Sequence, residues 1–265
     1  MNEVGSVTRR GFIGGAAASA VLAAAPNVFA QGSDKIRVGV IGCGGRGSGA
    51  AYNVLAADPN VEIVALGDLF PERVKELAGR LKAEHAARAK FTDDTTFSGW
   101  DAYKKVLASN CNYVILATPP GFRPNHFQAA VEAGKNIFME KPVAVDPNGV
   151  RKVIAASAVA QQKGLAVVSG TQRRHQAGYV ETIKRIHAGA IGEVLGGQVY
   201  WNQGGLWMNP RQPEWDDMTW QLKNWLYFTW LSGDHIVEQH VHNIDVANWV
   251  MNDTPVKVYG MGGRQ

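Results

Sequence analysis

One segment of this chain limits the possible folds more than any other. The apolar run Ile36-Arg37-Val38-Gly39-Val40-Ile41 is followed at once by Gly42, Gly44 and Gly47, in the spacing G-x-G-x-x-G. In a dinucleotide-binding turn, the first glycine permits a tight turn and the second lets the backbone approach a pyrophosphate. The third glycine allows the helix to pack closely on the strand. The segment therefore predicts a buried strand, a phosphate-binding turn and a helix.

The residues after the turn continue the same pattern. A helix-compatible stretch, 48–57, leads to a second apolar run, 61–66, and then to Asp68. A carboxylate about 20 residues after the last glycine can accept hydrogen bonds from ribose hydroxyls. Asp68 favours NAD because a carboxylate repels a 2′-phosphate, whereas the nearby cations Arg46 and Arg73 leave NADP open.

Strand and helix patterns go on alternating to residue 169, which predicts an α/β fold with a doubly wound parallel sheet. Ligands of such sheets bind beyond the carboxyl ends of the strands, where Asp68, Thr118 to Pro120 and Glu140 to Pro142 all fall. We predict a dinucleotide-binding Rossmann domain over residues 34–170. Its further elements are helices at 71–85, 101–108, 123–133 and 147–163, and strands that open at Phe91 and span 112–117, 136–139 and 165–169.

The two cysteines, Cys43 and Cys111, fall at opposite ends of parallel strands in this arrangement. A strand of about six residues at ~3.3 Å per residue keeps them farther apart than the ~7 Å between Cα atoms that a disulfide tolerates. We therefore predict that both thiols are free.

The first 30 residues have the pattern of an export signal. Arg9 and Arg10 precede Phe12 and an uncharged, weakly apolar stretch that is too short for the ~18–20 residues of a membrane span. Small residues then lead to Ala30 at the usual cleavage spacing. This predicts a twin-arginine signal peptide over residues 1–30, cleavage after Ala30, a periplasmic or otherwise exported product, and no stable membrane insertion after cleavage. An ordinary secretory signal and an uncleaved anchor are the alternatives.

Three motifs together resemble one oxidoreductase family. The glycine-rich turn, Thr118-Pro119-Pro120 with His126, and Glu140-Lys141-Pro142 after a strand are similar to the glucose–fructose oxidoreductase / inositol dehydrogenase / MocA (Gfo/Idh/MocA) family over about residues 35–250. The resemblance implies that Lys141 hydrogen-bonds the substrate hydroxyl beside the nicotinamide, and that the Lys141–Pro142 bond is cis. The cofactor-binding residues that we expect are Gly42, Gly44, Gly45, Arg46, Gly47, Asp68, Thr118, Pro119, Pro120, His126, Glu140 and Lys141.

The family has a second signature, an aspartate four residues before a histidine. Here His242 matches the histidine, but Glu238 replaces the aspartate with a side chain one methylene longer. His235, Glu238, His242 and Asp245 fall on one face of a predicted helix. We predict that Lys141, His242 and Glu238 are catalytic. The alternatives are a solvated helix face and a metal site made by His235, Glu238 and His242, although no metal is our expectation.

The second half of the chain differs in composition. All tryptophans except Trp100 lie between residues 201 and 249, in a segment rich in amides. Flat aromatic rings with amides suit sugar binding, although tryptophan also serves cores and subunit interfaces. We predict an α+β substrate and oligomerisation domain over 171–265, with strands at 193–203 and 255–261, truncated at its C-terminus, in a homo-oligomer. The substrate-binding residues that we expect are Arg173, Trp207, Trp225, His235 and Asp245.

Charge and location narrow the function. The net charge of +4 comes without a run of five like charges, which argues against nucleic-acid binding. Free NAD is not expected in a periplasm, so an exported enzyme of this type keeps its nucleotide bound. We therefore expect hydride transfer between a sugar or sugar-derived alcohol and a tightly bound nicotinamide. An NAD-dependent glycoside hydrolase or lyase acting by transient oxidation, and a non-enzymatic nucleotide-binding protein, are the alternatives.

Overall fold

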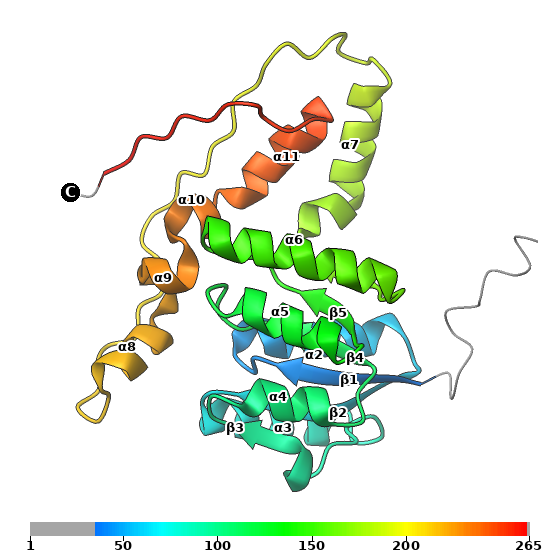
Figure 1. The fold of residues 1–265 in the computed structure, drawn as a ribbon, viewed down its shortest axis with the longest axis vertical. Coiled ribbons are helices and arrows are strands. Elements are labelled where there is room, and N and C mark those ends of the chain that lie inside the picture. Colours follow the sequence, from blue (N-terminus) through cyan, green and yellow to red (C-terminus); the bar gives the residue numbers. More distant parts are fainter. Residues whose placement is uncertain (1–34, 264–265) are drawn as a thin grey trace, which may run out of the picture. The chain divides into compact units, whose positions relative to one another are not determined.

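Six parallel strands form one sheet in the order β3-β2-β1-β4-β5-β6 (Figure 1). The computed structural model describes residues 35–263, so the predicted export signal lies outside the described residues. The order confirms the doubly wound sheet, because the chain moves outward from β1 to β3, returns beside β1 as β4, and then moves outward on the other side. The strands are β1 (Ile36–Ile41), β2 (Val61–Asp68), β3 (Thr96–Ser98), β4 (Tyr113–Leu116), β5 (Asn136–Met139) and β6 (Val167–Ser169).

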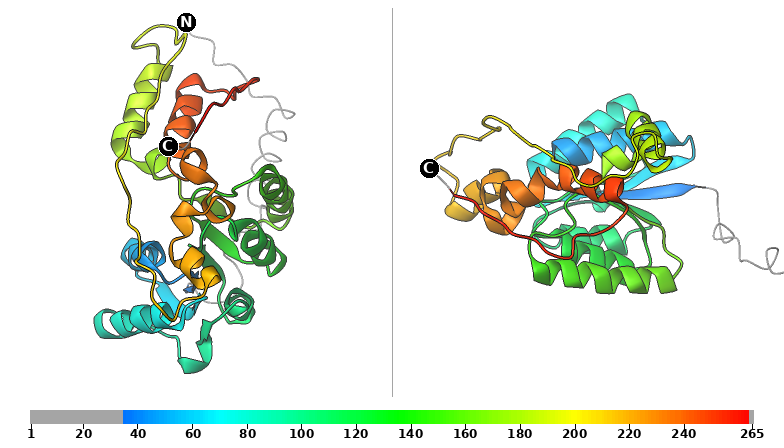
Figure 2. Two further views of the ribbon diagram at one scale, coloured as in Figure 1. Left: turned by 90° about the vertical axis from the view of Figure 1, so that its left-hand side faces the viewer. Right: turned by 90° about the horizontal axis from the view of Figure 1, so that it is seen from above.

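Helices cover both faces of the sheet (Figure 2). Neighbouring residues of β4 show why, because Val114 is buried in one core with Phe127 and Ala156, and Ile115 in the other with Leu77. Successive side chains of a strand point to opposite faces, so a strand that is apolar throughout must be covered twice. The helices α2 (Gly45–Ala57) and α3 (Pro71–Glu84) lie on one face, and α4 (Ala102–Ala108), α5 (Arg123–Glu132) and α6 (Pro147–Gln162) on the other.

The strand predicted to open at Phe91 is wrong. Phe91 is buried and packs in the core with α3, but it belongs to no strand. The chain makes a single bridge at Ala89 to Ile63, then turns through a short 3-10 helix, η1 (Asp93–Thr95), before β3 begins. Phe91 is therefore a single buried aromatic residue that holds the connection between α3 and β3 against the core.

The part of the chain after β6 is helical. It contains α7 (Ala177–His187), α8 (Asp217–Lys223), α9 (Thr229–Ser232), α10 (Asp234–Glu238) and α11 (Val241–Met251), with 3-10 helices η2 (Gln172–His175) and η3 (Trp225–Tyr227). The strands predicted at 193–203 and 255–261 are wrong, since both segments are irregular. Leu195 and Val256 are largely exposed there, and neither segment has a strand partner among the described residues. Within residues 35–263, none of the helices combines the length and the apolar character that crossing a membrane requires.

The helix predicted to carry His235, Glu238, His242 and Asp245 is two helices. α10 ends at Glu238 and α11 begins at Val241. The N–H groups of Gln239 and His240 both donate to the carbonyl of His235, at 3.0 Å each, which interrupts the regular ladder. The four residues therefore do not share one continuous face.

Both cysteines are free and buried, as predicted. Cys43 follows the carboxyl end of β1, whereas Cys111 precedes the amino end of β4, so the two residues lie at opposite ends of neighbouring parallel strands. The length of the strands keeps the two thiols too far apart for a disulfide.

Candidate active site

The glycine-rich turn follows the carboxyl end of β1, the strand at which the strand order of the sheet reverses. Gly42 has φ +95°, and a Cβ atom there would lie 2.7 Å from the carbonyl carbon of Ala117. A Cβ atom on Gly47 would lie 1.7 Å from the carbonyl oxygen of Gly42. Both positions therefore require glycine. The helix α2 begins at Gly45, earlier than predicted, so its first N–H groups lie in the turn, where a pyrophosphate can accept from them.

Asp68 ends β2 beside this turn. Its Oδ2 atom accepts a hydrogen bond from the N–H of Cys43 at 2.7 Å, and its Oδ1 atom accepts from the N–H of Phe70 at 2.9 Å. These two bonds fix the orientation of the buried carboxylate. Each oxygen keeps a further lone pair for a ribose hydroxyl, so the residues present fit an NAD-type dinucleotide.

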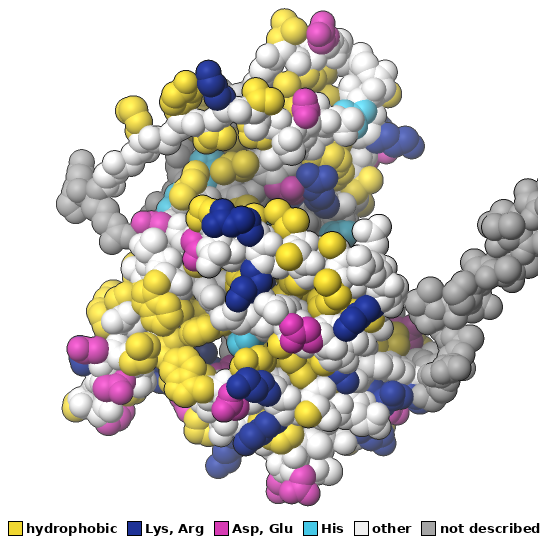
Figure 3. Space-filling view, viewed as in Figure 1, with side chains coloured by type: hydrophobic (Ala, Val, Ile, Leu, Met, Phe, Trp, Pro, Cys, Tyr) yellow, Lys and Arg dark blue, Asp and Glu magenta, His cyan; other side chains and the backbone are white. Residues whose placement is uncertain are grey.

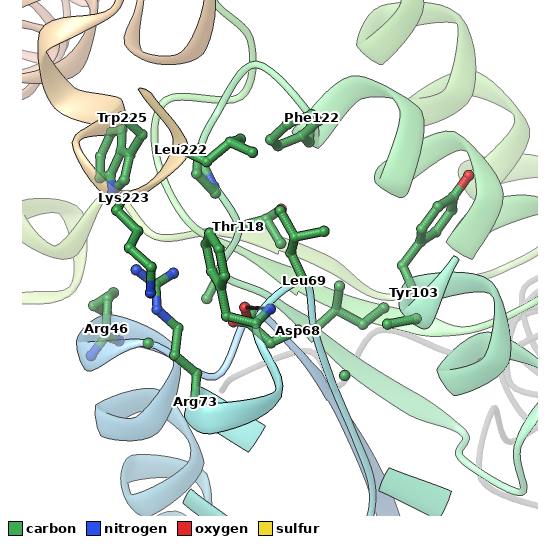
Figure 4. Close-up of a pocket in the computed structure, with 18 of the residues that line it drawn as sticks. Arg46, Asp68, Leu69, Arg73, Tyr103, Thr118, Phe122, Leu222, Lys223 and Trp225 are labelled. Atoms are coloured by element: carbon green, nitrogen blue, oxygen red, sulfur yellow. Dashed lines mark hydrogen bonds between the residues drawn. The ribbon is translucent and has the colours of Figure 1, made fainter. Parts of the chain in front are cut away.

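A cavity of about 450 Å³ lies over the turn and Asp68 (Figure 4). This volume falls in the range of small-molecule and cofactor sites. Gly47, Pro120, Glu140 and Lys141 lie outside the lining. The predicted cofactor-binding residues that do line the cavity are Gly42, Gly44, Gly45, Arg46, Asp68, Thr118, Pro119 and His126.

Aromatic residues that the sequence analysis missed form much of the remaining wall. The rings of Trp100 and Phe122 are 6.0 Å apart, and Tyr103 stacks on His126 at 4.2 Å. Figure 3 shows hydrophobic side chains gathered on this face where α8 and α9 lie, and Trp230 of α9 contacts Phe122 there at 6.0 Å. Trp100, Tyr103 and Phe122 follow the carboxyl ends of β3 and β4, which was the available signal, because loops at these ends line the site.

His126 is held neutral under the Thr118 loop. Its Nδ1 atom lies 3.1 Å from the Oγ1 atom of Thr118. Burial, and then the positive charge of Arg123, lower the pKa of His126 to about 4. At neutral pH the imidazole therefore serves as an uncharged hydrogen-bonding partner of the loop.

Lys141 and Glu238 form a nearly buried ion pair outside the cavity lining. The Nζ atom of Lys141 donates to the Oε1 atom of Glu238 at 2.5 Å and also to the backbone carbonyl of Glu238. The side chains are only 14% and 9% exposed. The Lys141–Pro142 peptide bond is cis. The turn after β5 and the end of α10 thus meet at this pair.

His242 belongs to the same region. It is buried on α11, and its ring stacks on Trp201 at 5.5 Å. Burial, and then the positive charges of Lys141 and Arg173, lower the pKa of His242 to about 4, against the opposing effect of Asp245. His242 is therefore a neutral imidazole at pH 7, which is the form that can accept a proton.

Glu140 connects the glycine-rich turn to the lysine. The Nε atom of Arg46 lies 2.6 Å from the Oε1 atom of Glu140. Gly170 makes room for this carboxylate, since a Cβ atom there would lie 2.6 Å from the Oε2 atom of Glu140. This pair ties the cofactor turn to the segment that carries Lys141.

Arg123 is a buried cation that the sequence analysis missed. It is 2% exposed, and its guanidinium donates to the carbonyl oxygens of Pro142 and Thr118, while its Nε atom has no partner. Burial lowers the pKa of Arg123 to about 10, so it stays charged at neutral pH. The available signal was its place at the first residue of α5, where the helix dipole disfavours a cation.

The predicted substrate residues separate into different places. Asp245 accepts from the Nη2 atom of Arg174 at 2.8 Å, and Arg173 donates to Asn243 and packs on the ring of Trp201. His235 is exposed. Among residues 35–263, no three side chains of His, Cys, Asp or Glu are placed to hold a metal ion. Trp207 and Trp225, 6.1 Å apart, line the cofactor cavity.

Known proteins match both the sequence and the fold. A family model of the GFO_IDH_MocA oxidoreductases, with an NAD-binding Rossmann fold, matches residues 36–170. Inositol 2-dehydrogenase 3 of Saccharopolyspora erythraea is 29% identical over 82% of this chain and 54% of its own length. A glycosyl hydrolase family 109 protein of Streptomyces niveus is 27% identical over 86% of this chain and 44% of its own length. The chain therefore spans about half the length of these curated relatives.

The fold is also found in solved structures. The apo scyllo-inositol dehydrogenase from Lactobacillus casei superposes with a TM-score of 0.58 over 82% of this chain and 55% of that one, at 18% sequence identity. At this identity the likeness shows a shared fold.

Proposed function

The chain belongs to the Gfo/Idh/MocA oxidoreductase family, and from this membership we propose that it transfers a hydride between a sugar-derived alcohol and a nicotinamide cofactor. Cyclitols such as inositol are the first substrates to test, because inositol 2-dehydrogenase 3 is one of its relatives. The observation that carries the proposal is the ion pair of Lys141 with Glu238, beside the neutral His242. Lys141 follows Glu140 in the chain, and Glu140 pairs with Arg46 of the glycine-rich turn, which supports a role for these proton-handling groups near a bound dinucleotide.

The dinucleotide would be held by three groups of this chain. The N–H groups at the start of α2 would donate to the pyrophosphate, the Asp68 carboxylate would accept from the ribose, and the Thr118 loop would contact the rest of the cofactor. We propose NAD as the preferred cofactor because Asp68 repels a 2′-phosphate. Arg46 and Arg73 also line the cavity and leave NADP as a second cofactor.

The nicotinamide, when bound, supplies the hydride acceptor for alcohol oxidation and the hydride donor for the reverse reaction. Lys141 uses two of its three N–H donors on Glu238, which leaves the third to polarise the substrate hydroxyl. His242, neutral at pH 7, takes the hydroxyl proton as the C–H bond gives up its hydride. The alcohol becomes a ketone, and one proton is released through the imidazole. Glu238 acts by holding the lysine.

Redox-neutral glycoside cleavage is the second candidate. It is favoured by the likeness to the glycosyl hydrolase family 109 protein. In this chemistry the alcohol is oxidised transiently, the neighbouring C–H becomes acidic, and the glycosidic bond breaks by elimination. Water adds, and the hydride returns to the ketone, so no net oxidation occurs. In the oxidation step Lys141 would polarise the hydroxyl and His242 would take its proton, as in the dehydrogenase reaction.

Export gives the proposal a physiological setting. Residues 1–30 would direct the folded protein through a twin-arginine route, with cleavage after Ala30. We propose that the nucleotide is loaded before export and retained afterwards. Intact-mass measurement of protein from the periplasmic fraction tests the cleavage, because the mature chain should begin at Gln31, and identification of the nucleotide released from the same protein tests the retention. Replacing Arg9 and Arg10 by lysine should leave the protein in the cytoplasm.

The direct test begins with the nucleotide. Purified protein is denatured, and the released nucleotide is identified by mass spectrometry. The protein is then incubated with NAD and either myo-inositol or scyllo-inositol while NADH absorbance is followed, and in parallel with p-nitrophenyl glycosides. Dehydrogenation produces NADH, whereas redox-neutral cleavage releases nitrophenol without net NADH.

Lys141→Met is the deciding variant. We expect it to lower turnover at least about 100-fold, the effect of removing an acid–base group, while NADH binding stays within about twofold of wild type. Lys152→Met is the control, because it removes an exposed lysine whose Nζ atom donates to Asn125. It should change neither turnover nor NADH binding. Turnover by Lys141→Met at the wild-type rate would refute the catalytic assignment.

A further inference from the structure

One wall of the dinucleotide cavity comes from far along the chain. Five residues from the clamp segment, defined here as residues 207–225, line the cavity opposite the glycine-rich turn. In Figure 4, Leu222, Lys223 and Trp225 come from this segment, and Lys223 extends toward Arg73 and the loop after β2. A ligand held on the turn would therefore lie between the two walls.

The two ends of the clamp segment are fastened to each other. The N–H of Asn209 donates to the Oδ1 atom of Asn224 at 2.7 Å, and the Nδ2 atom of Asn224 donates back to the carbonyl of Asn209 at 3.1 Å. The Nδ2 atom of Asn209 also donates to the carbonyl of Lys223 at 2.8 Å. Because Asn224 is fully buried, this exchange makes the two ends move as one unit.

The unit touches the Rossmann domain through Lys223. The Nζ atom of Lys223 lies 2.5 Å from the Oε1 atom of Glu72, in the first turn of α3, and 4.1 Å from the ring centre of Phe70. The side chain of Lys223 is only 16% exposed, while that of Glu72 is 58% exposed. Burial is the largest single effect and raises the pKa of Glu72. The hydrogen bond and charge of Lys223, the backbone N–H of Glu72 and the charge of Arg73 together lower this pKa overall. Lys223 therefore contacts the same loop that presents Asp68.

A second attachment lies just beyond the clamp segment. The N–H of Gly121 donates to the carbonyl of Leu231 at 2.8 Å, and a Cβ atom on Gly121 would lie 2.5 Å from the carbonyl oxygen of Trp230. This is a close backbone contact without a charged side chain. The two attachments differ in kind, since one is backbone to backbone and the other is an ion pair that can open.

We propose that Lys223 is a cofactor-retention residue, and that its pairing with Glu72 holds the clamp segment closed over the dinucleotide cavity. The inference rests on the proposed function in one respect, because it takes the cavity to hold a dinucleotide. Because the pairing fastens the clamp segment across the cavity, it must open for entry as well as for exit. Removing it should speed both steps and leave the equilibrium affinity nearly unchanged.

The test measures binding kinetics of NADH by stopped flow. Transfer of tryptophan excitation to NADH reports association, and a chase with excess NAD reports release. We compare Lys223→Gln, Glu72→Gln and the double variant with wild type. Arg185→Gln serves as the matched control, because it breaks an exposed ion pair with Glu181 on α7, at 2.8 Å.

We expect association and release to accelerate together by about tenfold in each single variant, with the Kd within about twofold of wild type. The double variant should be no faster than either single one, because the variants remove the same contact. Raising ionic strength should accelerate wild type toward the variants. Arg185→Gln should match wild type.

Three outcomes would overturn the proposal or its premise, and they differ. Unchanged rates in both single variants mean that the pair does not hold the clamp. A weaker Kd in Lys223→Gln, with Glu72→Gln at wild-type rates, means that Lys223 contacts the nucleotide directly. Wild-type protein that releases no nucleotide on denaturation and binds neither NADH nor NADPH means that the proposed function itself fails.

Discussion

Lys141 and Glu238 are 97 positions apart in the sequence, yet the Nζ atom of the lysine lies 2.5 Å from the Oε1 atom of the glutamate. The lysine follows β5 of the Rossmann domain, and the glutamate ends α10. The pair thereby joins the two halves of the chain at the candidate active site.

Shortening or neutralising the glutamate should weaken folding in a graded way. Glu238→Gln leaves a nearly buried ammonium without its carboxylate, and we expect it to lower the free energy of unfolding by about 3 kcal/mol. Glu238→Asp keeps the charge but retracts it by one methylene, and should cost about 1 kcal/mol. Urea unfolding followed by tryptophan fluorescence measures both changes.

An exposed pair provides the comparison. Glu181→Gln breaks the pair with Arg185 on α7, where both side chains are more than half exposed, and should change stability by no more than about 0.5 kcal/mol. Equal effects of Glu238→Gln and Glu181→Gln would show that the Lys141 contact does not stabilise the fold.

The two buried histidines should make stability depend on pH. The pKa values of His126 and His242 are about 4 in the folded protein, against 6.5 for the free side chain. Between pH 6.5 and 4 the unfolded state therefore binds more protons than the folded state. Stability should be fully present above pH 6.5 and fall as the pH is lowered toward 4.

Substituting the two histidines tests whether they cause the pH dependence of stability. His126→Gln and His242→Gln should each reduce the slope of unfolding free energy against pH over this interval, and the double variant should reduce it further. His175→Gln changes an exposed histidine and should leave the slope as it is. Urea titrations at half-unit pH steps measure the slopes, and a double variant with the wild-type slope would contradict the assignment.

The nucleotide half could be predicted because its signals are local. Apolar runs, the glycine spacing and Asp68 lie within a few dozen residues, and β1, α2 and β2 follow in the order they indicate. Phe91 misled the analysis because an isolated buried aromatic and the start of a strand look alike in sequence. Residues 193–203 misled it because a short segment of this kind forms a strand only where a partner strand is present.

The site could be predicted only in part, because many of its contacts join residues that are far apart in the sequence. Lys141, Glu238 and His242 were identified by a family motif, and the structure brings them together. Arg123 and Lys223 carry no motif, since their roles come from carbonyls and carboxylates that only folding brings near. The break between α10 and α11 also lies in a sequence whose spacing alone fits a single helix.

Glycine at position 47 should be indispensable for nucleotide binding. In Gly47→Ala the new methyl group would meet the carbonyl oxygen of Gly42 at 1.7 Å, so α2 must move away from the turn. We expect an increase of at least about 100-fold in the Kd for NADH and a loss of about 1–3 kcal/mol in stability from overpacking. Fluorescence titration and urea unfolding measure the two effects.

Gly79 offers the matched substitution. It lies inside α3 with no atom within 4 Å of a built Cβ. Gly79→Ala should bind NADH like wild type and gain about 1 kcal/mol, because alanine is the better helix former. Loss of binding in both variants would indicate a general effect of substitution and not a requirement of the turn.

Arg123 should be essential for joining the two loops of the site, because its guanidinium donates to a carbonyl on each of them, Thr118 and Pro142. Arg123→Met keeps most of the volume but leaves both carbonyls without this donor in a buried place, at an expected cost of about 2–5 kcal/mol. Arg123→Lys keeps the charge, but a single ammonium cannot reproduce the planar fork, so it should recover only part of the loss.

Urea unfolding of Arg123→Met, Arg123→Lys and the exposed control Arg151→Met ranks the three effects. Crystal structures of the variants that fold would show whether the Lys141 turn has shifted from Glu238. Full recovery of stability by lysine would mean that the charge matters and the fork does not. Wild-type stability in Arg123→Met would mean that the two loops are held by their own backbones, and that the buried guanidinium is not what joins them.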